Sequence, residues 1–338
     1  MAGRLADRIA RSGPIPYPEF VEACLYDETH GFYASGGAAG RRGDFLTSPE
    51  VGPLFGAVLA RWMDDVWEAL GQPGGFTVVD AGAGRGTLAR AVVAAGPRCL
   101  EAGTYLMVER SAVLRADQPS GIGFASSAHL PDGGITGVVV ANELLDNLPF
   151  GLLAADGDRW RSVRVGLEAD QLVEVLAEEC LPPVDIAPVP GARIPDQGSA
   201  AAWTTGALES LDFGALLVVD YTSTTTEMAT RPVDQWLRTY RGHQQGGRPV
   251  DDPGSQDITV EVAVDQLPEP TSTTDQATFL AAHGIDDLVA EGRQTWTEQA
   301  TTGDLAAVRG RSRIVEAEAL RDPTGLGGFT NLEWRVGC

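Results

Sequence analysis

Three closely spaced glycines behind an acid are the first residues of this 338-residue sequence whose spacing suggests chemistry. They stand in the stretch FTVVDAGAGRGTLAR, where Asp80 ends an apolar run and is followed by Gly82, Gly84 and Gly86. A plain strand-to-helix turn needs one glycine at positive φ and not three. The pattern therefore predicts a buried strand, a turn that a ligand approaches closely, and the start of a helix.

The spacing of these glycines distinguishes two kinds of cofactor. Dinucleotide-binding turns follow G-x-G-x-x-G and hold the pyrophosphate on backbone amides at the helix start. Here the glycines alternate, and Thr87 follows the third of them. A carboxylate directly before the turn would meet a positively charged ammonium group rather than a phosphate. We expect Asp80, Ala81, the three glycines and Thr87 to line a cofactor site, and a tight turn without a ligand is the alternative.

Polar residues also follow two other apolar runs. Glu109 comes after TYLMV, where a carboxylate can accept hydrogen bonds from ribose hydroxyls, and an ordinary surface glutamate is the alternative. Asn142, Glu143 and Asp146 follow GVVVA, and the alternative role of the two acids is to cap the helix that comes next. Carboxylates can orient a cationic nucleophile and take its proton, so Glu143 and Asp146 are candidates for groups that bind an acceptor.

The elements that must position these residues alternate between strand and helix. Apolar, β-branched runs predict strands, with helices between them, at residues 76–80, 104–109, 121–126, 137–142 and 215–221. This α/β order is typical of a parallel sheet that is covered on both faces. Ligands of such sheets bind at the carboxyl ends of the strands, which is where the candidates above lie.

An aromatic and glycine-rich loop precedes this core. Residues 30–56 are many for a loop without regular structure, and their aromatic side chains argue against disorder. We expect the loop around Asp44 and Thr47 to form a lid over the site, and a cap for the following helix is the alternative role. Ser48, in the sequence TSPE, is predicted to be the N-cap of that helix.

Several motifs, in order along the chain, resemble those of one enzyme family. They are HGFY, GRRGDFLTSPEVGPLFG, VVDAGAGRGTL, VVVANELLDNLPF, LLVVDY, LRTYRGHQ and PGSQDITVEVAVDQL. The sequence resembles the S-adenosylmethionine (SAM) dependent methyltransferases that include mitochondrial complex I assembly factor 7 and its bacterial MidA-type relatives. The resemblance implies the class I methyltransferase fold. That fold is an α/β, Rossmann-like structure with a mostly parallel seven-stranded sheet, an antiparallel strand pair at the C-terminus, and here a helical N-terminal extension and insertions.

The resemblance also implies a cofactor. SAM would be held by the glycine turn, with Glu109 at its ribose, and Thr47 and Asn142 would complete the cofactor site. No metal is needed, because methyl transfer depends chiefly on the alignment of nucleophile, methyl group and sulfur.

The acceptor that the resemblance implies is an arginine side chain of a protein in a respiratory complex. Glu143 and Asp146 would bind the guanidinium, and Asp44 and His243 are secondary candidates for catalysis. Three alternatives come from other classes. They are a nicotinamide or flavin oxidoreductase, which the glycine spacing disfavours, a SAM-binding assembly chaperone without catalysis, and an O- or N-methyltransferase of small molecules.

The composition limits the partners that the chain can have. A net charge of -22, from 47 acidic residues against 25 basic ones, disfavours nucleic acid because phosphate backbones would be repelled. Residues 251–300 carry 11 acids and one arginine, so an acidic surface could steer a cationic protein substrate, or surplus acid could simply aid solubility. No apolar run approaches the ~18 residues of a membrane span.

Cysteine usage and length bear on compartment and domain organisation. The four cysteines are scattered without C-x-x-C spacing, and no apolar signal segment is present, so we expect a cytoplasmic protein. We predict a helical cap with the lid loop at residues 1–72 and a methyltransferase core in two parts, at residues 73–149 and 212–338. A β-rich insertion is expected at residues 150–211, and an irregular inserted segment at about 222–274. The tract Thr222–Trp236 departs from the family pattern, so the substrate surface can differ there.

Overall fold

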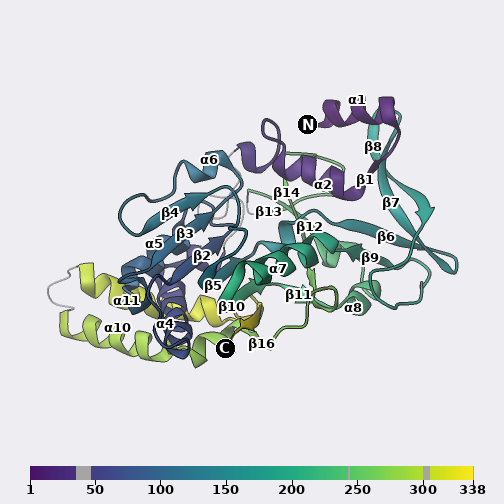
Figure 1. Ribbon diagram of the computed structural model, residues 1–338. Coiled ribbons are helices and arrows are strands. Elements are labelled where there is room, and N and C mark those ends of the chain that lie inside the picture. The colour runs from purple at the N-terminus through teal and green to yellow at the C-terminus, as the bar shows by residue number, and fades with distance from the viewer. Residues whose placement is uncertain (36–46, 243, 300–304, 338) are drawn as a thin grey trace.

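A seven-stranded sheet forms the centre of the molecule (Figure 1). The computed structural model describes residues 1–35, 47–242, 244–299 and 305–337. The strands of the sheet, in chain order, are β2 (Thr77–Ala81), β3 (Thr104–Val108), β4 (Phe124–Ser127), β5 (Ile135–Asn142), β10 (Leu211–Asp220), β16 (Ser272–Asp275) and β17 (Thr330–Val336).

The order of these strands is β16-β17-β10-β5-β2-β3-β4. The five strands from β10 to β4 pair in parallel, which requires a crossover connection between consecutive strands. β17 runs antiparallel to both β10 and β16. The predicted fold class, a mostly parallel seven-stranded sheet with an antiparallel pair formed by the C-terminal strand, is confirmed.

The two faces of the sheet are covered unequally. One face packs against α4 (Pro53–Ala69), α5 (Thr87–Ala95), α9 (Gln276–Ala282), α10 (Ile285–Gln299) and α11 (Leu305–Arg321). The other face packs against α7 (Gly198–Ser210). The expectation of a helix between every pair of consecutive strands is wrong for the link from β4 to β5. This link, residues 128–134, is described completely and contains no helix, because seven residues are too few for both a crossover and a helix.

A second core joins the N-terminus to two inserted regions. The N-terminal elements are α1 (Ala2–Ser12), β1 (Ile15–Pro16), α2 (Tyr17–Tyr26) and the 3-10 turn η1 (Tyr33–Ser35). Residues 150–211 contain β6 (Gly151–Asp156), β7 (Arg159–Glu168), β8 (Gln171–Glu179) and β9 (Arg193–Asp196), which form a sheet with β1. Apolar side chains of β1, β6, β7 and β8 are buried together with those of α1 and α2. The second core therefore holds the N-terminal helices beside the central sheet.

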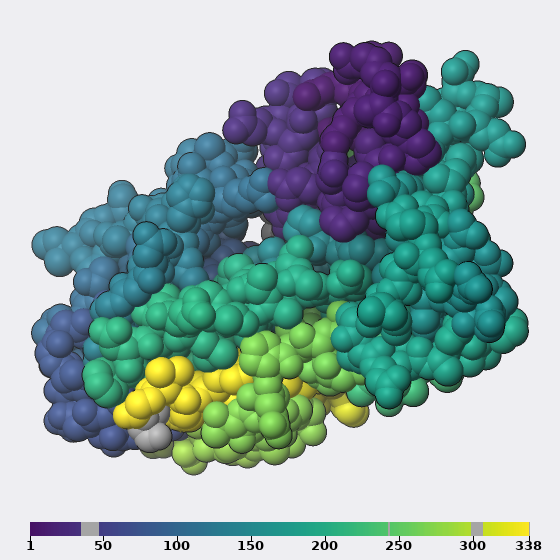
Figure 2. Space-filling model, turned by 45° about the vertical axis from the view of Figure 1, so that its right-hand side comes forward, coloured from purple at the N-terminus to yellow at the C-terminus, as the bar shows by residue number. Residues whose placement is uncertain are grey.

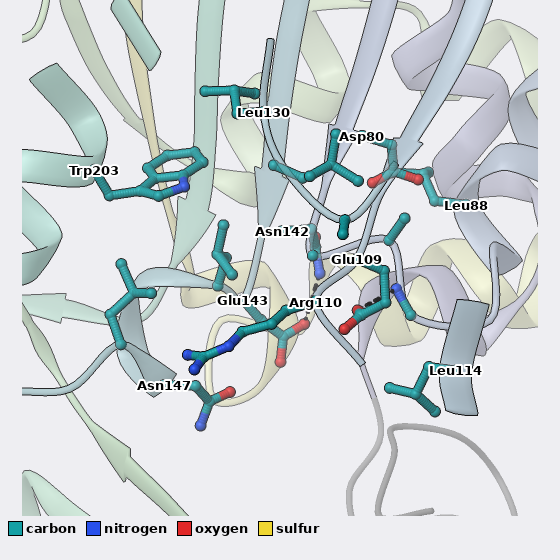
Figure 3. A pocket seen from close by; sticks show the side chains of 18 of the residues that line it. Asp80, Leu88, Glu109, Arg110, Leu114, Leu130, Asn142, Glu143, Asn147 and Trp203 are labelled. Atoms are coloured by element: carbon teal, nitrogen blue, oxygen red, sulfur yellow. Dashed lines mark hydrogen bonds between the residues drawn. The ribbon is translucent and has the colours of Figure 1, made fainter. Parts of the chain in front are cut away.

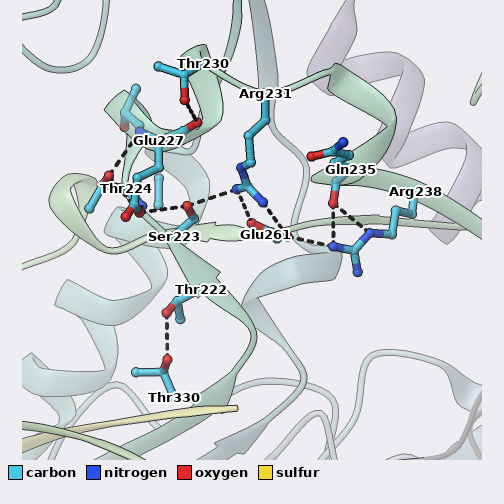
Figure 4. Close-up of polar contacts among 12 residues, drawn as sticks. Thr222, Ser223, Thr224, Glu227, Thr230, Arg231, Gln235, Arg238, Glu261 and Thr330 are labelled. Atoms are coloured by element: carbon cyan, nitrogen blue, oxygen red, sulfur yellow. Dashed lines mark hydrogen bonds and ion pairs between the residues drawn. The ribbon is translucent and has the colours of Figure 1, made fainter. Parts of the chain in front are cut away.

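The described residues of the second inserted region form regular elements, whereas the sequence predicted an irregular segment. It contains β11 (Thr222–Ser223), α8 (Thr225–Ala229), η4 (Val233–Gln235), β12 (Leu237–Arg241), β13 (Gln244–Gln245), β14 (Asp257–Val260), β15 (Val262–Ala263) and η5 (Val264–Gln266). Buried Trp236 and Ile258 join it to the second core. Its polar residues are also paired, as Figure 4 shows, because both Arg231 and Arg238 bind the carboxylate of Glu261.

The start of the helical segment after the long loop differs from its prediction. Ser48 is not an N-cap but the first residue of α3 (Ser48–Val51), and the preceding Thr47 caps the helix without a side-chain hydrogen bond. The hydroxyl of Ser48 is fully buried and donates to Oε1 of Gln276, at 2.9 Å, in α9. A tertiary partner thus replaces the local capping bond.

The acidic stretch near the C-terminus is partly neutralised by arginines from other elements. Arg61 of α4 lies 3.4 Å from carboxylate oxygens of both Asp287 and Glu291, and Arg321 lies 2.7 Å from Asp286. These exposed pairs contribute little free energy each, but they reduce the negative charge that this surface presents. In the described residues, no helix is both long enough and apolar enough to cross a bilayer.

The contact between α4 and α5 gives a test of the fold. A Cβ at Gly56 would lie 2.5 Å from Cβ of Ala91, so the two helices must separate in Gly56→Ala. We expect this substitution to lower the free energy of unfolding by about 1–3 kcal/mol, as overpacking does. A Cβ at Gly206 of α7 meets nothing within 4 Å, so the control Gly206→Ala should gain up to about 1 kcal/mol. Denaturant unfolding checks both values, and equal changes in the two variants would contradict the packing argument.

Candidate functional site

A cavity of about 620 Å³ lies at the carboxyl ends of β2, β3 and β5. Figure 2 shows a hollow between the purple N-terminal segment, the blue segment that includes β3 and β4, and the green segment that includes α7. In Figure 3 the carboxylates of Glu109 and Glu143 reach into this cavity. Tyr26 and Tyr33 of the N-terminal region complete its wall, so the cavity is built from both cores.

The glycine turn after β2 forms one side of the cavity. Gly84 lines it with a φ of 52°, and a Cβ at this position would meet no atom within 4 Å. Any side chain there would therefore be strained and would project into the open space. Gly82 lines the cavity as well, together with Ala81.

Gly86, the third glycine, does not line the cavity, contrary to the sequence expectation. It precedes α5 with a φ of 77°. A Cβ on it would lie 2.6 Å from Cδ of Pro119 and 2.9 Å from Sδ of Met107. Its role is to let the start of α5 approach β3 closely, which is a packing constraint rather than a ligand contact.

Asp80 supplies a buried carboxylate to the cavity. It is the penultimate residue of β2, is 3% exposed, and accepts a hydrogen bond of 3.1 Å from the hydroxyl of Tyr105. Burial, with the nearby charge of Glu109, raises the pKa of Asp80 to about 7. A carboxylate in this state gains most from a ligand that brings a positive charge.

Glu109 connects β3 to the glycine turn. Its Oε2 accepts from the backbone N–H of Gly84 at 3.0 Å, and its Oε1 accepts from the N–H of Ser111 at 2.7 Å. Burial raises the pKa of Glu109, and these backbone donors oppose the rise. The two bonds fix the carboxylate, which still has free lone pairs that face the cavity and can accept from hydroxyl groups of a ligand.

Thr47 and Thr87 also line the cavity, and they belong to elements that are far apart in the sequence. The Thr87 hydroxyl donates to Oε1 of Glu50 at 2.6 Å, which ties the start of α5 to α3. Glu50 lines the cavity too, although the sequence analysis did not select it as a site residue. The motif TSPE, which contains Glu50, was the sequence signal that could have identified it as a site residue.

Asn142 and Glu143 lie where β5 ends. The Nδ2 of Asn142 donates to Oε1 of Glu143 at 3.0 Å, and both residues line the cavity. Glu143 has a φ of 51°, an uncommon conformation for a residue with a side chain. Burial and the charge of Asp146 raise the pKa of Glu143 to about 8. The protonation of Glu143 can therefore change near neutral pH, and its positive φ costs conformational free energy.

Asp146 is close to the cavity but does not line it. It lies in η3 (Leu145–Asn147), is 2% exposed, and accepts from the hydroxyl of Tyr221. The capping role that was the alternative for Glu143 and Asp146 belongs to Asp220, whose Oδ2 accepts from the N–H of Leu145 at 3.1 Å. The sequence predicted that both Glu143 and Asp146 face the acceptor, whereas the structure places only Glu143 at the cavity surface.

Asp257 is a buried acid of the same region that the sequence analysis did not select. It begins β14, is 0% exposed, and its Oδ1 accepts from Nδ2 of Asn147 at 3.2 Å and from the Tyr33 hydroxyl at 3.4 Å. Burial and the charge of Asp146 raise the pKa of Asp257 to about 8. The signal was the motif PGSQDITV, in which Asp257 is the only acid.

Two stacked tyrosines form the wall of the cavity on the N-terminal side. The rings of Tyr26 and Tyr33 lie 5.5 Å apart, and both hydroxyls bind Asn147, which also lines the cavity. Arg110 lies over the Tyr26 ring, with its Cζ 4.5 Å from the ring centre, and pairs with Glu22. The Tyr26 ring is thus covered by Tyr33 and by Arg110, and the wall connects α2 to η3.

The opposite wall was missed by the sequence analysis. It comes from the link after β4 and from α7, and includes Leu130 and Trp203. Neither residue stands in a recognisable motif, so nothing in the sequence predicted their place. Two predicted site residues, Asp44 and His243, and most of the predicted lid lie outside the described residues.

Comparisons with known proteins agree with this geometry. A model of a family of S-adenosyl-L-methionine-dependent methyltransferases matches residues 58–282. The mitochondrial protein arginine methyltransferase NDUFAF7 of Mus musculus is 26% identical over 341 residues, which cover 85% of this chain and 74% of that protein. Its homologue in Drosophila melanogaster is 26% identical over 302 residues, or 78% of this chain and 68% of that protein.

Two solved structures from Burkholderia thailandensis are similar over 99% of the chain. One, bound to S-adenosyl-homocysteine, has a TM-score of 0.84 and 28% sequence identity, and the match covers 92% of that chain. The other has a TM-score of 0.79 and 26% identity, with 91% of that chain covered. The likeness therefore includes the N-terminal helices and both inserted regions, not the central sheet alone.

The buried acids predict how stability depends on pH. The raised pKa values of Glu143 and Asp257, about 8, mean that the folded protein binds more protons than the unfolded chain between about pH 4 and pH 8. Stability should therefore fall as pH rises through this range, and Asp257→Asn should make the fall shallower. The control Glu227→Gln changes an acid whose pKa is lowered, and it should keep the wild-type slope. Calorimetric melting temperatures across this range provide the test, and identical slopes for wild type and Asp257→Asn would refute it.

Proposed function

Because the chain belongs to the S-adenosyl-L-methionine-dependent methyltransferase family whose model it matches, we propose that it methylates an arginine side chain of a protein. The observation that carries this proposal is a cavity that combines a glycine cradle, at Gly84, with a partly buried acid, Glu143, on the acceptor side. The first feature fits the cofactor of the family, and the second fits a cationic acceptor.

The residues at the glycine turn fit SAM. The absent Cβ of Gly84 leaves open space in the cavity, so a ligand can touch the backbone there. Asp80 offers a carboxylate to the ammonium group, and Glu109 is held by backbone donors so that it can accept from ribose hydroxyls. When it is bound, SAM supplies a methyl group on a positively charged sulfur, which is open to attack by a nucleophile.

The acids near β5 fit the other reactant. A guanidinium nitrogen is a poor nucleophile while its lone pair is delocalised, so the protein must orient the group and remove a proton as the new N–C bond forms. Glu143 is the lining carboxylate at the end of β5, and within the described residues it forms no ion pair. With a pKa of about 8, Glu143 is mostly protonated at about pH 7 while the site is empty. A bound guanidinium favours the charged form of Glu143, and this form can accept the proton. The neighbouring Asp146, which does not line the cavity, adds negative charge close to Glu143.

The names of the relatives support the choice of acceptor. The proteins from Mus musculus and Drosophila melanogaster are both named protein arginine methyltransferases. The net charge of -22 favours a basic protein over a nucleic acid as substrate.

The proposal extends to the biological setting. The resemblance to complex I assembly factor 7 supports a subunit of a respiratory complex as the acceptor. We place the protein in the cytoplasm, because three of its cysteines, Cys24, Cys99 and Cys180, are free thiols, as in a reducing compartment. Mass spectrometry of proteins methylated in a host lysate with labelled SAM would identify the acceptor.

The cofactor assignment predicts a pH-dependent affinity. Since Asp80 has a pKa of about 7 and the ligand needs its charged form, binding of S-adenosylhomocysteine should weaken as pH falls below that value. Asp80→Asn should weaken binding at least tenfold at about pH 8, on the scale of a lost charge pair. The exposed Asp322→Asn is the control and should bind like wild type. Calorimetry can measure these affinities, and binding of NAD in place of S-adenosylhomocysteine would end the assignment.

The acceptor assignment predicts a separation of binding from transfer. Glu143→Gln keeps the shape of the side chain but removes its charge and its basicity. We expect unchanged affinity for S-adenosylhomocysteine and a fall in methyl transfer of about 10²-fold or more. The exposed Glu227→Gln should leave transfer intact. Normal transfer to arginine by the Glu143→Gln variant would remove Glu143 from catalysis, and absence of transfer by the wild type to any protein would favour a SAM-binding chaperone.

A further inference from the structure

Two buried carboxylate oxygens near the cavity have no partner. Oδ1 of Asp146 and Oδ2 of Asp257 receive no hydrogen bond, although the side chains are only 2% and 0% exposed. A buried ionised carboxylate without a cation is costly unless it is neutralised. Neither residue forms an ion pair within the part of the chain that the structure describes. The protein therefore retains two acids that it does not fully satisfy.

Asp220 shows what a purely structural acid looks like in the same place. It is also 0% exposed, but both of its oxygens accept backbone hydrogen bonds, Oδ2 from the N–H of Leu145 at 3.1 Å and Oδ1 from the N–H of Tyr221 at 3.0 Å. The fold thus supplies donors to Asp220 and leaves one oxygen of both Asp146 and Asp257 without any. Burial alone does not account for this difference.

Asp257 is separated from the cavity by one layer of side chains. Tyr33 and Asn147 both bind its Oδ1, and both line the cavity. Asp146 precedes Asn147 directly and follows the lining residue Glu143 by three positions. A cation that enters the cavity beside Glu143 would therefore sit within reach of the field of both acids, in a region where little water screens it.

We propose that Asp146 and Asp257 are the counter-charge for a cationic acceptor. The pair holds a proton while the cavity is empty and gives that proton to solvent when a guanidinium binds against Glu143, Tyr33 and Asn147. This inference rests on the proposed methylation of arginine. It makes charge, rather than shape, the property by which the site distinguishes arginine from a neutral side chain of the same outline.

The surroundings of the pair support proton exchange rather than permanent ionisation. The groups that face it from the neighbouring elements are the acids Glu143 and Asp220 and the phenols of Tyr26, Tyr33 and Tyr221. Two arginines lie over these rings, Arg110 over Tyr26 and Arg238 over Tyr221, but they pair with Glu22 and Glu261 and not with Asp146 or Asp257. Each additional negative charge there favours the protonated form of the pair, and an arriving cation reverses that preference.

The test is calorimetric binding of a short arginine peptide to the protein saturated with S-adenosylhomocysteine, at about pH 7.5, in phosphate and in Tris buffer. The difference in heat between the two buffers gives the protons released, and we expect about one per peptide. The peptide with citrulline, a neutral analogue of arginine, should bind at least tenfold more weakly and release none. Asp257→Asn should release fewer than half as many protons, with tenfold weaker arginine binding and unchanged affinity for S-adenosylhomocysteine. Glu227→Gln is the matched control and should match wild type.

The outcomes distinguish this inference from the function on which it rests. If the arginine peptide binds wild type and Asp257→Asn equally, or releases no proton from either, the counter-charge role is wrong while arginine remains the acceptor. If wild type binds S-adenosylhomocysteine but not the arginine peptide, the acceptor assignment fails, and the inference fails with it. The melting temperature of Asp257→Asn shows whether the variant is folded, and Asp257→Glu, which keeps the charge, should restore proton release.

Discussion

The register of the parallel strands β2, β3 and β5 is the constraint on which the site depends. Ala81 of β2 pairs with Val108 on one side and with Ala141 on the other, so the three strands end at the same level. Asp80, Glu109 and Asn142 each stand within one residue of that level. A slip of one residue would turn every side chain of a strand to the opposite face of the sheet. Because these strands are apolar on both faces, their apolar pattern alone does not fix the register. The polar residues at their ends help to fix it, and so does the close approach of Gly137 to Thr77, where a Cβ would lie 1.9 Å from a backbone oxygen.

Chemistry at this edge also requires a second core that is distant in the sequence. The N-terminal helices and the two inserted regions share buried apolar residues, and they bring Tyr33 and Asp257 to the end of β5. The Tyr33 hydroxyl binds Asn147 and Asp257 at once, so one side chain connects η1, η3 and β14. The cavity wall therefore depends on the stability of both cores, and loosening of the second core would open the site without disturbing the sheet.

The site retains features that oppose folding. Four acids, Glu143, Asp146, Asp220 and Asp257, are gathered around the end of β5, and burial raises the pKa of each. Glu143 also adopts a positive φ of 51°. Such departures from the most stable arrangement are concentrated at functional sites, because a charge that is poorly satisfied in the empty protein is available to a ligand. The contrast with Asp220, which backbone donors satisfy, separates the acids that hold the fold from those that await a partner.

The sequence by itself determined the local units of this protein. The apolar run, the acid and the spaced glycines around Asp80 specify a strand, a turn and a helix, because each depends on neighbours along the chain. The polar residues after the strands, Glu109 and Glu143, followed from the same pattern. Only the tertiary structure decided which side chains face the cavity. Gly86 turned out to serve packing, and Asp257 entered the site from an inserted region, because contacts between residues far apart in sequence decide the direction of a side chain.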